Sequence, residues 1–496
     1  MASALGVTLL GGAAVANAIA GQESSSAAPS VPAAPKAAPA AGQSDALIVG
    51  YKPKAPGARS DTAVRQDTKA VAAQAEEKLS FDRRLGTGAV LVDLGGEQPA
   101  KDVAEVMDQF RADPDVAFVV PDRTVRAAAV ASPSNPNDPR LGEQWDLTEA
   151  RAGMNVPDAW RTSTGRGVTI AVLDTGSAPH SDLAANTVAG YDFITDAFTA
   201  KDGGGRDNDA SDPGDASKAG DCKDALGRPL PAARSSWHGT HVAGTVAAVA
   251  DNGKGVVGVA HGAKVQPVRV LGRCGGSTSD IVDAITWASG GAVAGVPANG
   301  TPAQVINMSL GGGGACDPAT QGAIDSAVQR GTTVVVAAGN ENSDAASSSP
   351  ASCNNVITVA ATNRAGDKAG YSNFGNAVDI SAPGGVTNRN PAALDGILST
   401  LNSGADAPAA ETFAFYEGTS MAAPHIAGLA ALLKAAMPAL TPAELERAMK
   451  DNARPLPGTC AGGCGSGLAD AARTVANVAG GATPPEDPAS PPAEDE

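Results

Sequence analysis

The chain has 496 residues, of which 43% are hydrophobic and only 3% aromatic, so it is long enough for two or more domains with cores of small apolar side chains. Its net charge of −17 argues against nucleic acid as a partner, because phosphate binding requires a basic surface. No segment offers the ~18 unbroken apolar residues of a membrane span, so no membrane contact is expected.

The first 139 residues fall into four segments that differ in composition and pattern. Residues 1–21 hold an apolar stretch with small residues in "ANA" and "AIA", which is typical of the late part of a secretory signal peptide. Residues 22–44, rich in Ala, Ser and Pro, predict a flexible linker. Strand-like segments and one segment with the apolar spacing of an amphipathic helix predict a small α+β domain over 45–126. Three prolines among small residues predict an exposed processing junction over 127–139.

From residue 140 to 478, apolar segments alternate with helical ones. The segments "VTIAVLD", "AKVQPVRVL", "QVINMSL", "TTVVVAAGN" and "NVITVAA" are expected to be strands buried on both faces. Helix signals between them include Asp317 as N-cap followed by Pro318. This alternation predicts an α/β fold with a doubly wound parallel sheet and helices on both faces. The acidic, Pro-rich residues 479–496 predict a disordered tail.

Three polar motifs fall where a parallel sheet collects its functional groups, at the carboxyl ends of strands. Asp174 ends the strand "VTIAVLD"; its "DTG" is also typical of aspartic proteases, but there is no second DTG or DSG. His238 and His241 lie three residues apart at a helix start, where one could simply cap the helix. A metal site there would need a third ligand, and the other three histidines carry no metal-binding motif.

The third motif is "GTSMAAPH", in which Ser420 begins a long apolar helix. A serine at this position is most often only a cap. The preceding Gly418 would let another backbone approach, however, and the helix N-terminus favours the negative charge that forms when a serine attacks a carbonyl. Pro424 is tolerated in the first turn, where backbone N–H groups have no partners within the helix.

An Asp, a His and a Ser in this chain order can form a nucleophilic triad. The stretches "AVLDTG", "HGTHVAGT", "INMSLGG", "VVVAAGNEN" and "GTSMAAPH" resemble the subtilisin-like serine proteases, or subtilases, in the expected order within residues 165–436. The resemblance implies a secreted, monomeric serine endopeptidase that cleaves extended polypeptides through an acyl-enzyme intermediate. It also implies that 140–478 is the catalytic domain, and that 45–126 is a ferredoxin-like inhibitory propeptide, chaperone to its own chain and removed by self-cleavage.

Individual roles follow from the same resemblance. Asp174, His238 and Ser420 match the catalytic triad, His241 a structural histidine, and Asn340 the oxyanion-hole asparagine. The segments that match the substrate-binding walls and the floor of the S1 pocket contribute Gly275, Gly276, Ser309, Leu310, Gly311 and Ser348.

Six cysteines without a C-x-x-C pair are typical of disulfides in an oxidising compartment. We expect pairing in chain order. A Cys316–Cys353 bond would join the segments that follow the binding loop and the S1 region. Cys460 and Cys464 enclose only Ala-Gly-Gly, and a Cys222–Cys274 bond would fix the insertion between Asp174 and His238 beside the substrate groove.

That insertion carries five aspartates within residues 202–215, with glycines among them. A solvated acidic loop is the simplest interpretation. Packed carboxylates repel one another without a cation, however, so Asp202, Asp207, Asp209 and Asp212 are predicted to bind one structural Ca²⁺. Calcium sites are common in the family that the chain resembles, and Asp182 with Asn252 approximately match one of them. No organic cofactor is expected.

Two other functions remain open from the sequence. A pseudo-protease would bind peptides without cutting them, although Asp174, His238, Ser420 and Asn340 are all present. A serine esterase of the α/β-hydrolase type would require G-x-S-x-G, which the sequence does not contain.

Overall fold

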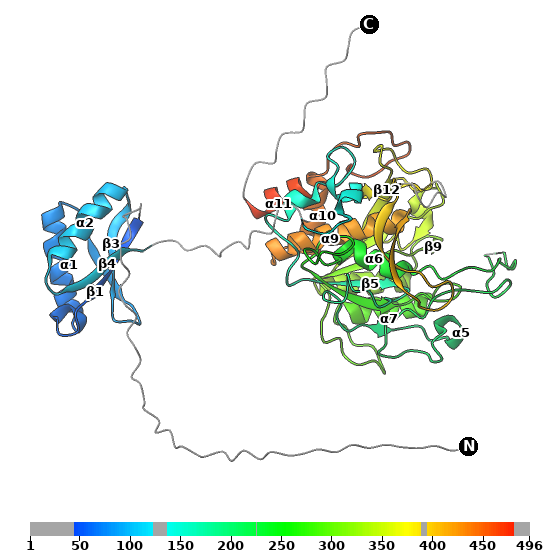
Figure 1. Cartoon of the computed structure of the whole chain (residues 1–496), viewed down its shortest axis with the longest axis horizontal. Coiled ribbons are helices and arrows are strands. Elements are labelled where there is room, and N and C mark those ends of the chain that lie inside the picture. The colour runs from blue at the N-terminus through cyan, green and yellow to red at the C-terminus, as the bar shows by residue number, and fades with distance from the viewer. Residues whose placement is uncertain (1–43, 123–135, 225, 388–393, 481–496) are drawn as a thin grey trace, which may run out of the picture. The chain divides into compact units, whose positions relative to one another are not determined.

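The computed structural model describes residues 44–122, 136–224, 226–387 and 394–480. The chain divides into two compact units, residues 1–128 and 129–496 (Figure 1). The predicted signal peptide lies outside the described residues, as do nearly all of the linker, most of the processing junction and the acidic tail from residue 481.

The smaller unit is an α+β domain with the element order of a ferredoxin-like fold. Its antiparallel sheet has the strand order β2-β3-β1-β4, and both helices contribute to one core with the sheet. Helix α2 buries the four apolar residues of its predicted stripe: Val103, Val106, Met107 and Phe110. The elements are β1 (Ser44–Tyr51), α1 (Asp61–Ala75), β2 (Ser80–Arg84), β3 (Val90–Gln98), α2 (Ala100–Ala112) and β4 (Val116–Pro121), with a 3-10 turn η1 (Pro56–Ala58).

The larger unit is built on a seven-stranded sheet with the order β13-β12-β10-β8-β5-β7-β6, and all of its strand pairs are parallel. The α/β prediction is therefore confirmed. Strand pairing places the ends of β5, β8 and β10 in the middle of one sheet edge. The strands are β5 (Thr169–Asp174), β6 (Tyr191–Asp192), β7 (Lys264–Arg269), β8 (Val305–Met308), β10 (Thr333–Ala337), β12 (Ile357–Thr362) and β13 (Ile380–Pro383).

Helices cover both faces of this sheet, and strand β5 shows why. Its Ile170 and Val172 belong to a core with α6 and α9, whereas Ala171 and Leu173 belong to a second core with α7 and α8. Successive side chains of a strand point to opposite faces of the sheet, so a strand of unbroken apolar residues must be buried by helices on both faces. The helices are α3 (Trp145–Thr148), α4 (Val156–Ala159), α5 (Ala197–Ala200), α6 (His238–Ala247), α7 (Thr278–Ala288), α8 (Pro318–Gln329), α9 (Thr419–Ala436), α10 (Pro442–Asp451) and α11 (Ala471–Ala479).

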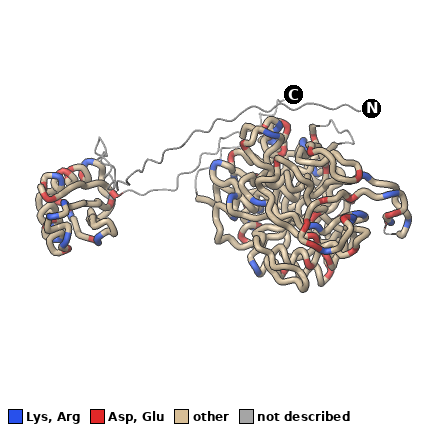
Figure 2. The backbone as a smooth tube through the Cα atoms, turned by 60° about the horizontal axis from the view of Figure 1, so that its bottom comes forward, with Lys and Arg blue, Asp and Glu red and all other residues tan. Residues whose placement is uncertain are grey.

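Two small antiparallel pairs complete the larger unit. Strands β14 (Ile397–Asn402) and β15 (Glu411–Tyr416) form a hairpin, and β9 (Gly312–Gly313) pairs with β11 (Ser348–Ser349). The remaining 3-10 turns are η2 (Leu141–Glu143) and η3 (Ala345–Ser347). Among the described residues, no helix is both long and apolar enough to cross a membrane. Lys and Arg are dispersed over both units, whereas Asp and Glu gather densely in one area of the larger unit (Figure 2).

Candidate active site

The end of β5 and the start of α6 bring Asp174 and His238 together. His238 Nδ1 lies 2.8 and 2.9 Å from the two carboxylate oxygens of Asp174, and Asp174 is completely buried. Burial alone would lower the pKa of His238, but the charge and hydrogen bond of Asp174, helped by the charges of Asp215 and Asp212, raise that pKa above its ordinary value. The imidazole is thereby oriented and made a better base.

Ser420 lies in the first turn of α9, a helix that packs against the same sheet. Its Oγ donates to the Ser309 carbonyl at 3.2 Å, so in this rotamer the hydroxyl is directed to the end of β8 rather than to His238. The Ser309 hydroxyl in turn donates to the Ser420 carbonyl at 2.8 Å. This reciprocal pair fixes the helix start against the segment that follows β8.

Asn340 lies beyond the end of β10 and faces the start of α9. Its Oδ1 accepts hydrogen bonds from the Thr419 N–H at 2.9 Å and from the Thr419 hydroxyl at 3.0 Å. Among the described residues its Nδ2 has no partner, so this group is available as a donor beside Ser420. Thr419 could not be singled out from the sequence, because its role depends on its hydrogen bonds to Asn340 Oδ1 in the folded chain.

A groove of about 760 Å³ is lined by His238, Ser309, Asn340 and Ser420, whereas Asp174 is buried behind His238 and does not line it. Its lining combines most of the predicted catalytic and substrate-binding residues with a wall from the insertion. Gly276 and Ser348 do not line it; Ser348 is buried and accepts a hydrogen bond from Asn373 Nδ2 at 3.1 Å. The predicted catalytic and substrate-binding residues in the lining are His238, Gly275, Ser309, Leu310, Gly311, Asn340 and Ser420.

Three disulfides brace the larger unit, and they join the pairs expected from chain order. They are Cys222–Cys274, Cys316–Cys353 and Cys460–Cys464. The first joins two residues that both line the groove, so it fixes the insertion to the wall after β7. The second lies beside the β9–β11 pair, which links the loop after β8 to the segment that contains Ser348.

His241 lies one turn further along α6 and has a different environment. It is completely buried, its Nε2 lies 3.1 Å from the Ile397 and Ala414 carbonyls, and its ring stacks on Tyr416. Burial lowers its pKa to about 3, so the ring is neutral and joins α6 to the β14–β15 hairpin.

The four aspartates predicted as one calcium site each have their own hydrogen-bond or ion-pair partners in this structure. Within the described residues, no group of three or more His, Cys, Asp or Glu side chains could hold a metal ion. Asp202 pairs with Arg269 at 2.8 Å, while Asp207 and Asp209 each accept from the backbone N–H two residues later. Asp212 is buried against the Thr175 hydroxyl at 2.7 Å. Short acidic side chains in tight turns are satisfied locally.

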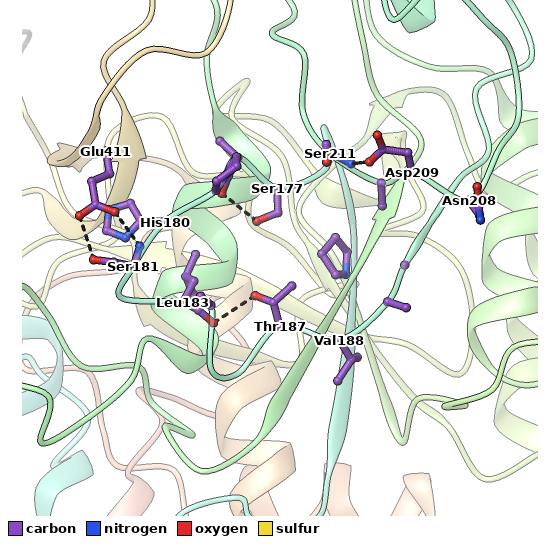
Figure 3. A pocket seen from close by; sticks show the side chains of 17 residues that line it. Ser177, His180, Ser181, Leu183, Thr187, Val188, Asn208, Asp209, Ser211 and Glu411 are labelled. Atoms are coloured by element: carbon purple, nitrogen blue, oxygen red, sulfur yellow. Dashed lines mark hydrogen bonds between the residues drawn. The ribbon is translucent and has the colours of Figure 1, made fainter. Parts of the chain in front are cut away.

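A second cavity, of about 620 Å³, lies between the segment after β5, the insertion and the start of β15 (Figure 3). Asp209 lines this cavity and Asp212 does not, which further separates the two carboxylates. Glu411 lines this cavity, and its two carboxylate oxygens accept hydrogen bonds from the N–H and the hydroxyl of Ser181 (Figure 3).

The other calcium candidate is more compact. Asn252 Nδ2 donates to Asp182 Oδ1 at 2.6 Å, and the Val256 N–H donates to Asp182 Oδ2 at 3.0 Å. Asp138 lies nearby, with one buried carboxylate oxygen that has no hydrogen-bond partner among the described residues. Burial raises the pKa of both carboxyls, and the charge of Asp182 raises the pKa of Asp138 further. Carboxylate and amide oxygens, which these three side chains carry, are the ligands that a hard cation such as Ca²⁺ prefers.

Comparison with known proteins agrees with this architecture. The model of the subtilase family, peptidase S8, matches residues 165–476. The chain therefore belongs to the subtilase family of serine endopeptidases, which confirms the resemblance inferred from the motifs.

The chain is also similar to individual proteases. The chain is 54% identical to an extracellular protease of Xanthomonas campestris over 84% of its own length and 69% of that protein. It is 43% identical to an extracellular basic protease of Dichelobacter nodosus, over 88% of this chain and 70% of that one. A solved protease structure from Pseudoalteromonas arctica shares 55% identity and a TM-score of 0.67, covering 69% of this chain and 99% of that one.

Proposed function

We propose that this subtilase is a secreted, self-processing endopeptidase in which Asp174, His238 and Ser420 form the catalytic triad. The observation that carries the proposal is the 2.8 Å contact between His238 Nδ1 and the buried carboxylate of Asp174, at a groove that Ser420 and Asn340 also line. Two of its relatives are named extracellular proteases, which supports a location outside the cell.

The chemistry follows from these positions. The Ser420 hydroxyl turns from the Ser309 carbonyl to His238 Nε2, gives up its proton and attacks the peptide carbonyl; such hydrogen bonds often tighten only once substrate is bound. Asp174 holds the Nδ1–H tautomer and stabilises the imidazolium. The negative oxygen is stabilised by the Ser420 N–H and Asn340 Nδ2. His238 then protonates the leaving amine, and water hydrolyses the acyl-enzyme by the same route.

Substrate is an extended polypeptide that adds a strand beside Ser309–Gly311 and the segment of Gly275. We assign the unit over 45–126 the role of an inhibitory propeptide that assists folding and is removed by self-cleavage within 127–139. The βαββαβ architecture of that unit supports this assignment.

We also assign a structural calcium site to Asp182, Asn252 and Asp138. Their oxygens would hold the ion and connect the segment after β5 to the loop around residue 252. The ion would neutralise two buried carboxylates and would take no part in peptide cleavage.

Labelling with a fluorophosphonate tests the proposed function. We expect the full chain to incorporate the probe, the Ser420→Ala variant to remain unlabelled, and the active protein to cleave casein much faster than it releases product from a short-chain ester. A folded wild-type protein that fails to label would be a pseudo-protease. Labelling with ester hydrolysis but no cleavage of casein would indicate an esterase.

A further inference from the structure

The insertion between Asp174 and His238 contains a turn, residues 212–215, that contacts both sides of the proposed catalytic pair. Asp212 begins it and Asp215 ends it, and only Pro and Gly separate them. Asp212 is buried, with 2% of its surface exposed. The mechanism above uses neither residue.

On the aspartate side, the connection runs through Thr175. The Thr175 N–H donates to Asp174 Oδ1 at 2.7 Å, and the Thr175 hydroxyl donates to Asp212 Oδ2 at 2.7 Å. The same hydroxyl accepts from the Gly239 N–H at 3.0 Å, directly after His238. Thr175 is therefore a junction between the strand end, the helix start and the insertion.

On the histidine side, the connection runs through Ser236. Asp215 accepts from the Ser236 N–H at 2.6 Å and from its hydroxyl at 2.8 Å. The Ser236 hydroxyl accepts from the His238 N–H at 3.3 Å. Between them Trp237 has a φ of 52°, a left-handed conformation that a bulky residue adopts only when its surroundings enforce it.

Backbone atoms pack closely around this turn. A Cβ at Gly176 would lie 2.6 Å from the Ala210 carbonyl oxygen, and one at Gly239 would lie 2.2 Å from the Gly176 carbonyl oxygen. The Asp212 N–H also donates to the Ser177 carbonyl at 3.3 Å. The insertion, β5 and α6 therefore touch one another through backbone atoms, with little room to shift.

We propose that Asp212 and Asp215 are positioning residues for the catalytic pair, Asp212 acting on Asp174 through Thr175 and Asp215 acting on His238 through Ser236. This inference rests on the proposed triad. It replaces the metal-ligand role predicted for Asp212 with one in the alignment of the base.

The charges of the turn give this role a measurable signature. The acidic groups that face His238 are Asp174, Asp215 and Asp212, and each raises its pKa. Asp212 itself faces Asp215 and Arg269, and burial raises its pKa to about 6, so it is ionised at pH 8. Replacing Asp212 or Asp215 by Asn should lower the pKa of His238 and move the acidic limb of kcat/KM to lower pH.

The test compares Asp212→Asn, Asp215→Asn, Thr175→Val and Thr175→Ser with Asp221→Asn, a control that removes a carboxylate from the outer part of the same insertion. In matured enzyme we expect the first three to lower kcat about tenfold to a hundredfold with KM little changed, since small misplacements of catalytic groups have effects of this size. Thr175→Ser should restore kcat because it keeps the hydroxyl, and Asp221→Asn should behave as wild type.

A second readout is independent of turnover. In the full-length Ser420→Ala protein, the pKa of His238 is followed by NMR titration and assigned with His238→Gln. A lower pKa in Asp212→Asn and in Asp215→Asn supports the inference. An unchanged pKa together with unchanged kcat, or equal kcat in the Val and Ser variants of Thr175, overturns it. If Asp212→Asn does not fold, the Thr175 pair makes the same comparison. Failure of the proposed function would look different, because wild type itself would then lack turnover.

Discussion

The proposed catalytic edge of the sheet and the acidic insertion are both rich in polar residues, yet only the edge brings its polar side chains together. At the edge, Asp174, His238, Asn340 and Ser420 come from segments up to 246 residues apart, from Asp174 to Ser420 in the sequence. In the insertion, Asp202, Asp207, Asp209 and Asp212 lie within a few residues of one another and have separate partners.

The difference lies in how each side chain is directed. A strand end and a helix start have fixed directions, and a parallel sheet brings all its carboxyl ends to one edge. A loop has no such common direction, so each aspartate accepts hydrogen bonds from its own turn or binds the nearest cation, here Arg269. Sequence proximity is therefore a weaker guide to a site than position at the ends of buried elements.

The largest effect should come from removing the proposed nucleophile, Ser420. We expect Ser420→Ala to abolish proteolysis, a loss of about 10⁶-fold in kcat as known for the same kind of change in subtilisin, a member of this family. The variant should accumulate as a precursor that retains residues 45–126, as seen by intact mass. Normal maturation in the absence of other proteases would contradict both the triad and self-processing.

A smaller loss is expected at the oxyanion side of the edge. Asn340→Ala should lower kcat about 10²- to 10³-fold with KM little changed, the range known for the oxyanion asparagine of subtilisin. Steady-state kinetics on a chromogenic peptide measures it, and the exposed Asn354→Ala is the matched control. An effect on KM alone would place Asn340 in substrate binding instead.

Calcium distinguishes the insertion from the compact pocket around Asp182. Thermal unfolding of the Ser420→Ala protein should shift upward with calcium relative to EGTA, by about 2.7 kcal/mol of stability at a hundredfold excess over Kd. We expect the shift to persist in Asp207→Ala/Asp209→Ala and to vanish in Asp182→Asn. The reverse pattern would restore the insertion as the metal site.

The remaining prediction concerns His241, which lies one turn deeper in α6 than the proposed base, and a pH-dependent stability rather than catalysis. In the folded protein the pKa of His241 is about 3, below the ordinary value of 6.5. As the pH falls, His241 of the unfolded chain is therefore protonated before His241 of the folded protein. Its stabilising contribution is complete above pH 6.5 and is lost toward pH 3, at up to about 1.4 kcal/mol per pH unit. His261, with a pKa lowered to about 4 by burial, adds to the same trend.

Urea unfolding of the Ser420→Ala protein between about pH 6.5 and pH 4 measures this slope, since both histidines titrate there on unfolding. Substituting His241→Gln should make the free energy of unfolding fall less steeply with acid, without removing the part due to His261. An equal slope in both proteins would show that His241 does not titrate on unfolding.

Much of the scaffold could be predicted from local pattern. The predicted strand segments "VTIAVLD" and "AKVQPVRVL" contain β5 (Thr169–Asp174) and β7 (Lys264–Arg269). By contrast, β6 has only two residues and β13 ends in Pro383, so neither shows a recognisable strand pattern. The β14–β15 hairpin was also missed; β14 is wholly buried and has no alternation, and its partner follows a long connection.

The sequence by itself determined the layered α/β fold, the order of the motifs and the family, because periodicity, capping residues and short motifs are local properties of the chain. Only the tertiary structure decided which polar groups meet. It placed Asp212 beneath Thr175, directed Asn340 Oδ1 to Thr419, and separated the aspartates of the insertion. Those outcomes depend on long-range packing, in which a hydrogen bond forms with whichever partner the folded backbone brings within reach.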